Sequence, residues 1–335
     1  MLDGKTVLLT GGTGSFGKTF TQIVLKRFKP KRLIIFSRDE LKQLEMRQMF
    51  PDTGDSPMRY FIGDIRDRER LYRALDGVDI VVHAAALKQV PTAEYNPQEA
   101  VKTNILGASN LIDAAIDRNV QNVVALSTDK AVNPVNLYGA TKLCSDKLFV
   151  AANSYSGYHK TKFSLVRYGN VVGSRGSVVP RFLELRKTGI LPITDPRMTR
   201  FWITLQQAVL FVLDSFDRMA GGEIFVPKIP SMNIMDLARA VAPECKTEIV
   251  GIRSGEKLHE VMVAEDDARN TREYDEYFVI FPQFHEWATS PRMGGNPCAD
   301  NFRYSSDNNT QWLNEHQLKT MLGLSQRKSI ATIES

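Results

Sequence analysis

The sequence predicts an α/β protein with a Rossmann-type, doubly wound parallel sheet and a smaller C-terminal substrate-binding lobe. Three observations support this fold class. Short apolar runs alternate with helical patterns through the first half, a glycine-rich turn follows the first run, and glycine and proline become frequent after about residue 169. Strands that alternate with helices of this length form βαβ units, and such units build a parallel sheet with helices on both faces.

The strands are predicted from the apolar runs. Runs such as VLLT, IIF, IVV and VVAL lack polar alternation, as expected for strands that are covered on both faces. The predicted strands are Thr6–Thr10, Arg32–Phe36, Arg59–Ile62, Asp79–His83, Asn122–Ser127 and Phe163–Arg167. The predicted helices are Ser15–Phe28, Glu40–Met49, Arg68–Leu75, Gln98–Arg118 and Tyr138–Tyr155.

The change in composition suggests how the chain is divided. We expect a dinucleotide-binding Rossmann domain over residues 1–168, to which later segments return. The glycine- and proline-rich stretch over 169–290 suits a lobe that covers a ligand, and residues 291–335 form a C-terminal extension whose polar end we expect to fray.

Length and composition bound the class of protein. The 335 residues are 43% hydrophobic and 24% charged, which is ordinary for a globular protein. No run of about twenty apolar residues occurs, so no membrane span is expected. The first apolar run is too short for a signal peptide. We therefore expect a cytoplasmic protein.

Charge and cysteine content give few signals of other functions. Cys144, Cys245 and Cys298 are far apart and have no metal-ligand spacing, so neither a disulfide framework nor a bound metal is expected. The net charge of +5 fits an anionic small molecule and equally an ordinary solvated surface. No basic tract is interleaved with aromatic residues, which argues against a nucleic-acid partner.

A glycine-rich turn joins the first predicted strand to the first predicted helix. Its glycines, Gly11, Gly14 and Gly17, have the spacing G-x-x-G-x-x-G. Glycines allow a tight turn and let backbone N–H groups approach a pyrophosphate at the positive end of the helix. The position between a strand and a helix is the context that such a motif requires. We predict a dinucleotide site that includes Thr13, Ser15 and Phe16 of the same turn.

The end of the second strand bears on which dinucleotide binds. An acidic residue there binds a ribose 2′-hydroxyl and favours NAD, whereas arginine accommodates a 2′-phosphate. Ser37 and Arg38 come first, and Lys42 lies one turn into the next helix. We therefore expect NADP, while Asp39 keeps NAD as the alternative.

Residues after the third and fourth strands complete the predicted cofactor site. Asp64, followed by Ile65, is placed to accept a hydrogen bond from the adenine amine. Small residues from Ala84 to Ala86 let the backbone approach the cofactor, although simple packing explains them equally well.

The pair Tyr138 and Lys142 indicates redox chemistry. The two residues are one helical turn apart and therefore share a face. An ammonium at this place lowers the pKa of the phenol and holds the cofactor ribose, and the phenolate can accept a proton from a hydroxyl as hydride leaves the same carbon. Tyr138 and Lys142 are thus assigned to both catalysis and cofactor binding.

An acid and a base follow the fifth strand. Thr128, Asp129 and Lys130 stand where that strand ends, and the carboxyl ends of parallel strands are where open sheets bind ligands. We predict that Asp129 and Lys130 face the bound substrate. The alternative is a solvated ion pair.

These segments resemble a known family. The chain, over roughly residues 3–290, looks like an extended short-chain dehydrogenase/reductase that acts on nucleotide sugars. GGTGSFG, AALKQVP, STDKAVNP and LYGATK resemble the inverting UDP-N-acetylglucosamine 4,6-dehydratases, which start pseudaminic acid biosynthesis. The retaining dTDP-glucose 4,6-dehydratases have Glu where Lys130 stands. Membrane-anchored relatives usually have Met at the place of Tyr138, and they carry membrane spans.

The resemblance implies a reaction. Tyr138, assisted by Lys142, takes the C4 hydroxyl proton while hydride passes to NADP. Lys130 then removes the C5 proton, for which its pKa must be depressed. Asp129, protonated beforehand, gives a proton to the C6 hydroxyl, hydride returns to C6, and C5 is reprotonated from the opposite face. Thr128 hydrogen-bonds the C4 oxygen.

The resemblance also implies a UDP-sugar site and a homo-oligomer, a dimer or a hexamer. Arg253 and Glu256 look like the pair that binds the diphosphate and the ribose, and surface charge is the alternative for both. The implied substrate-binding residues are Lys88, Asn170, Arg181, Thr194, Arg200, Arg253 and Glu256, and Lys88 is also counted with the cofactor site.

Two other functions fit the same scaffold. A nucleotide-sugar 4-epimerase needs Tyr138 and Lys142 but has no use for Asp129 and Lys130, because it releases no water. A non-catalytic NADP-sensing regulator needs none of the four, and such proteins tend to lack the Tyr-x-x-x-Lys pair.

Overall fold

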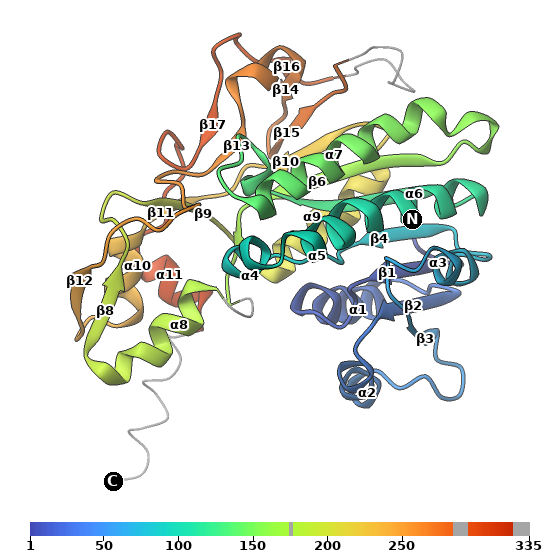
Figure 1. The fold of residues 1–335 in the computed structure, drawn as a ribbon, viewed down its shortest axis with the longest axis horizontal. Coiled ribbons are helices and arrows are strands. Elements are labelled where there is room, and N and C mark those ends of the chain that lie inside the picture. Colours follow the sequence, from blue (N-terminus) through green and yellow to red (C-terminus); the bar gives the residue numbers. More distant parts are fainter. Residues whose placement is uncertain (174–176, 284–293, 324–335) are drawn as a thin grey trace.

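The computed structural model describes residues 1–173, 177–283 and 294–323. Within these residues, ten strands form one sheet in the order β16-β14-β15-β10-β6-β5-β4-β1-β2-β3 (Figure 1). The strands from β3 to β10 in this order are parallel, and β15, β14 and β16 join their neighbours antiparallel. The parallel strands are β1 (Thr6–Thr10), β2 (Arg32–Ser37), β3 (Met58–Ile62), β4 (Ile80–His83), β5 (Asn122–Thr128), β6 (Lys162–Tyr168) and β10 (Ile224–Pro227).

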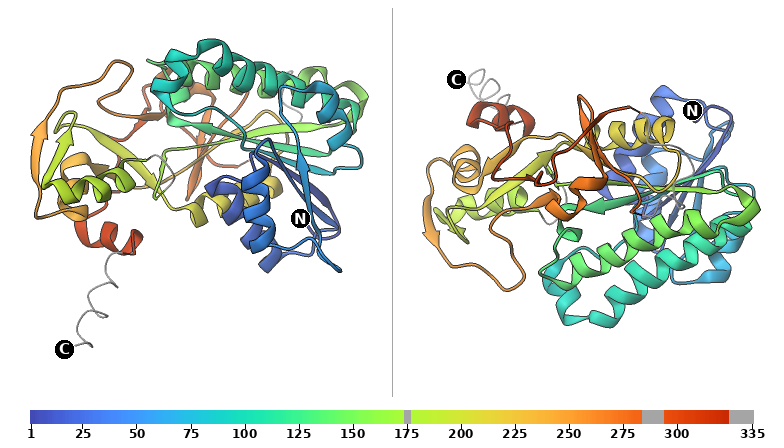
Figure 2. Two further views of the ribbon diagram at one scale, coloured as in Figure 1. Left: turned by 60° about the horizontal axis from the view of Figure 1, so that its bottom comes forward. Right: turned by 90° about the horizontal axis from the view of Figure 1, so that it is seen from above.

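Helices cover both faces of this sheet, which explains why its strands are apolar throughout. One core lies under α1 (Ser15–Arg27), α2 (Glu40–Met49) and α9 (Leu205–Arg218). The other lies under α3 (Arg68–Ala74), α6 (Gly107–Asp117) and α7 (Leu137–Tyr155). The right-hand view of Figure 2 shows α6 and α7 on one side of the sheet and α1 and α9 on the other. The predicted Rossmann-type, doubly wound sheet is confirmed.

The strand order reverses between β1 and β4, and this reversal places the site. The chain moves outward from β1 to β2 and β3, then crosses back to β4 and continues to β5 and β6. Connections on either side of such a point diverge to opposite faces and leave a crevice at the carboxyl ends of the strands. All the predicted site segments of the first half follow these strand ends.

A smaller lobe forms from the second half of the chain and lies at the left of Figure 1. Its core is separate from the two cores of the sheet and joins α8, α10 and α11 with Trp202 of β9. The elements of this part are β7 (Asn170–Val171), α8 (Val178–Leu185), β8 (Ile190–Ile193), β9 (Thr199–Ile203), β11 (Ser231–Asn233), α10 (Ile234–Val241), β12 (Lys246–Ile249) and α11 (Glu315–Met321). The pair of β13 (Val261–Val263) and β17 (Tyr304–Ser305) packs instead on the core of the large sheet.

Segments of the second half also return to the large sheet. Helix α9 packs against α1, and β10 pairs with β6. The antiparallel edge consists of β14 (Thr271–Glu273), β15 (Tyr277–Ile280) and β16 (Asn296–Pro297). The chain therefore crosses between the sheet and the lobe more than once.

One predicted helix differs from the structure. The stretch predicted as a single helix, Gln98–Arg118, consists of α5 (Pro97–Val101), a π-helical turn (Lys102–Leu106) and α6, and it is preceded by the short α4 (Val90–Tyr95). The apolar periodicity carries through the π turn, so the sequence pattern does not reveal it. The turn buries Asn104, whose amide donates to the Leu87 carbonyl at 2.9 Å and accepts from the Leu87 N–H at 2.8 Å. The irregular turn thus holds the loop after β4.

Candidate active site

A cleft of about 660 Å³ opens at the carboxyl ends of the parallel strands. It runs from the tip of β2, past the glycine turn and the end of β4, to the end of β5 and the start of α7. Every predicted cofactor residue except Gly17 lines it: Gly11, Thr13, Gly14, Ser15, Phe16, Ser37, Arg38, Lys42, Asp64, Ile65, Ala84, Ala86, Lys88, Tyr138 and Lys142.

The glycine turn is shaped for an anionic ligand. Gly11 has a φ of +65°, and a Cβ there would lie 2.9 Å from the backbone of Ala85. The N-cap of α1, Gly14, provides no side-chain cap, and the first turn of α1 holds no acidic residue, so the positive helix end faces the cleft unneutralised. Gly17 lies behind the wall, where a Cβ would stand 2.0 Å from the Gly12 oxygen. Gly17 therefore allows the helix to pack on the turn rather than forming part of the wall.

The tip of β2 presents more cationic than anionic surface. Asp39 caps α2 by accepting from the Lys42 N–H, and its carboxylate lies 2.6 Å from Lys42 Nζ. These hydrogen bonds from Lys42 lower the pKa of Asp39. Arg38, with half of its side chain exposed, lies 3.4 Å from Asp64. Asp39, the acid that would select NAD, is thus engaged with Lys42, and Arg38 is engaged with Asp64; all four side chains line the cleft.

Two buried polar residues that the sequence analysis missed hold the end of β4. The Thr10 hydroxyl oxygen accepts from the N–H groups of Ala84 and Ala85 at 3.1 and 3.2 Å, and it lies 2.8 Å from His83 Nδ1. Burial lowers the pKa of His83 to about 3, so the ring is neutral and can accept the Thr10 proton. Polar residues at the ends of two strands that are otherwise apolar are the sequence signal that could have revealed them.

Tyr138 and Lys142 both line the far end of the cleft, as their spacing predicted. Burial raises the pKa of Tyr138 to about 12, while the Lys130 ammonium and a hydrogen bond with Thr128 pull it down. Burial lowers the pKa of Lys142, although Asp146 opposes the shift. The cation that lowers the pKa of Tyr138 in this arrangement is Lys130, and the predicted role of Lys142 toward the phenol stays a prediction.

Lys130 and Asp129 are in contact at the end of β5. Lys130 Nζ donates to Asp129 Oδ1 at 3.0 Å and to Asn170 Oδ1 at 3.4 Å. Lys130 lines the cleft, but Asp129 is fully buried behind it and is not among the described residues of the wall. Asp129 Oδ1 also accepts from the Thr128 hydroxyl at 2.9 Å, and Thr128 does line the cleft.

The protonation states of this pair agree only in part with the prediction. Burial raises the pKa of Asp129, and the Glu260 carboxylate adds to the shift against the opposing Lys130 charge, so Asp129 takes up a proton more readily than an ordinary carboxylate. Burial alone would lower the pKa of Lys130, but the carboxylates of Asp129 and Glu260 raise it above its ordinary value. The expected depression of the Lys130 pKa is therefore wrong for this arrangement, because two anions outweigh the burial.

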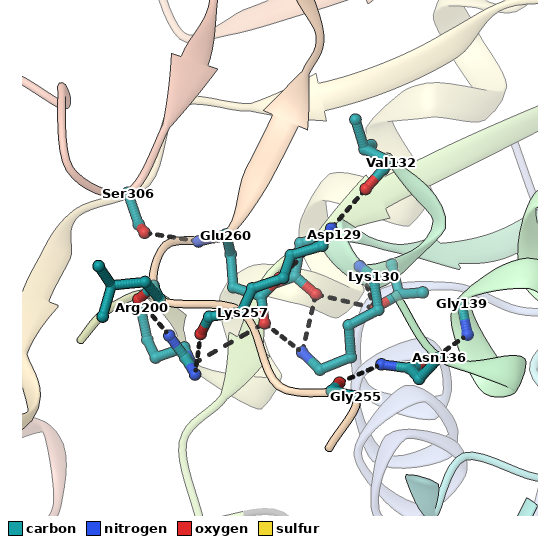
Figure 3. Close-up of polar contacts among 12 residues, drawn as sticks. Asp129, Lys130, Val132, Asn136, Gly139, Arg200, Gly255, Lys257, Glu260 and Ser306 are labelled. Carbon is teal, nitrogen blue, oxygen red and sulfur yellow. Dashed lines mark hydrogen bonds and ion pairs between the residues drawn. The ribbon is translucent and has the colours of Figure 1, made fainter. Parts of the chain in front are cut away.

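Glu260 belongs to a buried ion cluster that the sequence analysis missed (Figure 3). Its Oε1 lies 3.4 Å from Lys130 Nζ and 3.8 Å from Arg200 Nε, and its Oε2 lies 4.0 Å from Lys257 Nζ. The side chain of Glu260 is 4% exposed. It comes from a segment of no recognisable motif, 130 residues beyond Lys130, so no local pattern could have indicated it.

The loop that carries Lys257 and Glu260 is tied to the segment that carries Lys130. Lys257 Nζ donates to the Val132 carbonyl, and Asn136 Nδ2 donates to the Gly255 carbonyl at 2.8 Å. At Gly139 a Cβ would stand 2.1 Å from the Lys130 carbonyl oxygen, so only glycine lets α7 pack this closely. Figure 3 shows these contacts converging on Lys130 from both sides.

The predicted substrate residues fall into two groups. Lys88 and Asn170 line the cleft, and burial together with the Lys130 charge lowers the pKa of Lys88. Arg200 points into the ion cluster, where it donates to the carbonyls of Thr199, Leu258 and Lys257. The other predicted substrate residues are not among the described residues that line the cleft: Arg181, Thr194, Arg253 and Glu256.

Comparisons with known proteins place this site in a family. The family model of the polysaccharide biosynthesis protein matches residues 7–282. The chain belongs to this family. It is 57% identical over 328 residues, 95% of this chain and 97% of the relative, to "UDP-N-acetylglucosamine 4,6-dehydratase (inverting)" of Campylobacter jejuni subsp. jejuni serotype O:23/36 (strain 81-176). The resemblance that the four sequence segments indicated is thereby confirmed.

The chain is also similar to a relative with a different printed activity and to a solved structure. The chain is 43% identical, over 84% of each chain, to "UDP-glucose 4-epimerase" of Rickettsia canadensis (strain McKiel). The structure is similar to that of Pen from Bacillus thuringiensis, with a TM-score of 0.88, 36% identity, and coverage of 97% of this chain and 99% of that one. Among the residues that the structure describes, no helix combines the length and the hydropathy needed to span a bilayer.

Proposed function

We propose that this chain is an NADP-dependent UDP-N-acetylglucosamine 4,6-dehydratase that inverts C5. Its product is UDP-2-acetamido-2,6-dideoxy-β-L-arabino-hex-4-ulose, the first intermediate of pseudaminic acid biosynthesis. The observation that carries the proposal is the contact of Lys130 with Asp129 beside Tyr138, at the end of the cleft opposite Arg38. The name of the Campylobacter relative supports it.

The residues of the cleft fit a dinucleotide with a 2′-phosphate. The open N-terminus of α1 and the Gly11 turn suit the pyrophosphate, and Arg38 and Lys42 suit the phosphate on the ribose. Asp64, whose carboxylate also accepts from Arg66, would accept from the adenine amine, and Lys142 would hold the ribose nearer the reaction. When bound, NADP supplies a hydride acceptor for C4 that is restored when C6 is reduced, so none is consumed.

Tyr138 acts first in the proposed mechanism. Its phenolate takes the proton of the C4 hydroxyl. The pKa of the Tyr138 phenol is about 12, and the positive charge of Lys130 favours formation of the phenolate. Lys130 thus has to be charged at this stage. Thr128 holds the C4 oxygen from the cleft wall.

Lys130 then has to become a base, and its contact with Asp129 provides the route. Transfer of one proton from Nζ to Asp129 Oδ1 across their 3.0 Å hydrogen bond yields a neutral amine and a carboxylic acid together. The raised pKa of Asp129 favours this transfer. The amine takes the C5 proton, which the C4 ketone has made acidic. Because the pKa of Lys130 is raised, the side chain becomes a neutral base only through this transfer to Asp129.

The carboxylic acid of Asp129 supplies the proton for the departing C6 hydroxyl. Because Asp129 is buried behind the wall, we propose that the proton passes through the Thr128 hydroxyl, which contacts Asp129 Oδ1 at 2.9 Å. Thr128 gives its own proton to the C6 oxygen and takes the Asp129 proton, so water leaves without a net change in Thr128. Reprotonation of C5 from the opposite face then gives inversion.

The nucleotide part of the substrate is assigned to the second half of the chain. Lys88 and Asn170 face the cleft next to Lys130 and suit the sugar. Arg253 and Glu256 lie 3.9 Å from each other on the loop that reaches the catalytic residues, and we retain them for the diphosphate and the ribose. A cytoplasmic location and a homo-oligomer stay predictions.

The second candidate function is a nucleotide-sugar 4-epimerase. The name of the Rickettsia relative favours it, because 43% identity over most of the chain is substantial. An epimerase, however, releases no water and gives Asp129 and Lys130 no task.

One incubation separates the two functions. Purified protein is incubated with UDP-N-acetylglucosamine and NADP in heavy water, and the product is followed by mass spectrometry and proton NMR. A dehydratase yields a 4-keto-6-deoxy sugar that has lost one water and carries one deuterium at C5, with the L configuration there. UDP-N-acetylgalactosamine of unchanged mass would establish the epimerase instead, and binding of NADP without turnover would revive the regulator.

A further inference from the structure

We propose that Glu260 is a positioning residue of this reaction, which holds the Lys130 amine in place and sets how readily it gives up its proton. This proposal rests on the proposed function, in which Lys130 changes between a charged and a neutral form. Glu260 acts through Lys130 and is not among the described residues that line the cleft.

The first argument is the arrangement of acceptors around Lys130 Nζ. Three oxygens surround it: Asp129 Oδ1 at 3.0 Å, Asn170 Oδ1 at 3.4 Å and Glu260 Oε1 at 3.4 Å. An ammonium has three N–H groups, whereas a neutral amine has two and a lone pair. When one proton passes to Asp129, Glu260 and Asn170 remain as acceptors for the two that stay. The lone pair formed in this way first points at Asp129, and rotation about the Cε–Nζ bond presents it to the substrate while Glu260 still accepts from one N–H.

The second argument is how firmly the chain fixes Glu260. The Glu260 N–H donates to Ser306 Oγ at 2.9 Å, and its carbonyl accepts from the Ser306 N–H at 2.8 Å. Ser306 Oγ also lies 2.7 Å from Thr199 Oγ1. Strand β9 and the segment after β17 thus clamp the backbone of Glu260, and its carboxylate has little freedom to move away from Lys130.

The third argument is that the contacts of the Glu260 carboxylate are poorly suited to stabilising the fold. A buried carboxylate is costly unless its oxygens are hydrogen-bonded and paired. Glu260 Oε2 has no hydrogen-bond partner among the described residues, and the cations around the carboxylate lie at 3.4 to 4.0 Å. Such loose contacts stabilise the fold weakly, but they place a negative charge beside the one amine that must change its protonation.

The charges that face Lys130 come from several elements. Asp129 precedes it in the same 3₁₀ turn, Tyr138 comes from α7, Lys88 from the loop after β4, and Arg200 from β9. Arg200 and Lys88 oppose the charge of Lys130, and Asp129 and Glu260 favour it. Removing the Glu260 charge therefore lowers the pKa of Lys130, and it also leaves Arg200 and Lys257 without their shared carboxylate.

The test compares Glu260→Gln with Glu265→Gln, an exposed acid five residues further on. Competitive acetylation of the full chain with trace acetic anhydride across a pH series, followed by peptide mass spectrometry, gives the pH at which Lys130 becomes reactive. We expect Glu260→Gln to lower this pH by about one unit or more, as removal of an adjacent opposite charge does, and Glu265→Gln to leave it unchanged. An unchanged Lys130 midpoint in folded Glu260→Gln overturns the proposal.

Kinetics with UDP-N-acetylglucosamine supply the second readout. In Glu260→Gln the alkaline limb of the kcat profile, where Lys130 loses the charge that acts on Tyr138, should move to lower pH by the same amount, with KM altered less than about twofold. If Glu260→Gln does not fold, Glu260→Asp keeps the charge but shortens the reach. We expect it to lower kcat about tenfold with little change in KM, because small displacements of a catalytic group are costly. Wild-type kcat in Glu260→Asp contradicts the role.

The two readouts separate this proposal from the proposed function. The acetylation experiment needs no substrate. If wild-type protein fails to convert UDP-N-acetylglucosamine but the Lys130 midpoint still shifts in Glu260→Gln, the dehydratase assignment is wrong and the coupling of Glu260 to Lys130 stands. If conversion occurs and neither the midpoint nor the alkaline limb moves, Glu260 has no part in setting the pKa of Lys130.

Discussion

The two ends of the cleft hold similar charges in opposite surroundings. At the tip of β2, Arg38, Lys42 and Asp39 have side chains that are 50%, 43% and 41% exposed. At the end of β5, Asp129 and Glu260 are 1% and 4% exposed. Water screens the charges at the tip of β2, so each ion pair there contributes little to stability and its side chains can turn to a ligand. Burial couples the second set, so each charge changes the protonation of its neighbours.

Removal of the Lys130 amine should have the largest effect. Lys130→Met keeps the length of the side chain but has no group that can take the C5 proton, so we expect kcat for dehydration to fall at least about 10³-fold. NADP binding, measured by fluorescence titration, should stay within about twofold, because the cofactor end is distant in the cleft and solvated. Lys162→Met, at an exposed position, serves as the control. Full activity in Lys130→Met would remove Lys130 from the base role.

Asp129→Asn should have the next largest effect. An amide keeps the shape but cannot accept the proton from Lys130 or return it to the leaving hydroxyl, so we expect kcat to fall about 10²-fold with KM little changed. Solvent deuterium exchange at C5, followed by NMR, shows which half-reaction fails. A mild loss would show that another acid serves the C6 oxygen.

The two ends also differ in how far the sequence could predict them. The cofactor end is built from short segments in which the glycine spacing, the strand and the helix are all contiguous, so the residues that line this end of the cleft could be predicted, and their binding of a cofactor stays a prediction. The Tyr138–Lys142 pair and the Asp129–Lys130 pair lie within one loop and one helix and could be predicted for the same reason.

What the sequence could not predict is assembled from distant segments. Glu260 reaches Lys130, and Ser306 reaches Glu260, only through the tertiary fold, and neither stands in a recognisable pattern. The raised pKa of Lys130 follows from that assembly, which is why a depressed value was expected. The π turn of Lys102–Leu106 could not be predicted because the buried residues Ala100, Asn104 and Ala108 keep the four-residue spacing of an ordinary α-helix across it. Arg200 was predicted to bind the substrate, but in the fold its guanidinium donates to three backbone carbonyls.

Gly139→Ala tests the buried end through its packing rather than its charge. The new methyl group would stand 2.1 Å from the Lys130 carbonyl oxygen, and backbone has to shift to admit it. We expect a loss of about 1–3 kcal/mol in the free energy of unfolding by urea, together with reduced kcat. Gly77→Ala has open space around its Cβ and reports only the strain of a positive φ. Equal stability losses without a loss of kcat in Gly139→Ala would show that this contact does not position Lys130.

Arg38→Ala should have the smallest effect and tests the exposed end. A charged hydrogen bond from Arg38 to the 2′-phosphate contributes to the binding of NADP but not of NAD, so we expect the Kd of NADP to rise about tenfold and that of NAD to change less than twofold. Both are measured by isothermal titration at low and at physiological salt, because an exposed cation should lose part of its effect as salt is added. Arg47→Ala, an exposed arginine on α2 that is not among the described residues of the wall, is the matched control. If Arg38→Ala weakens both dinucleotides equally, Asp39 rather than Arg38 selects the cofactor, and the exposed end of the cleft favours NAD.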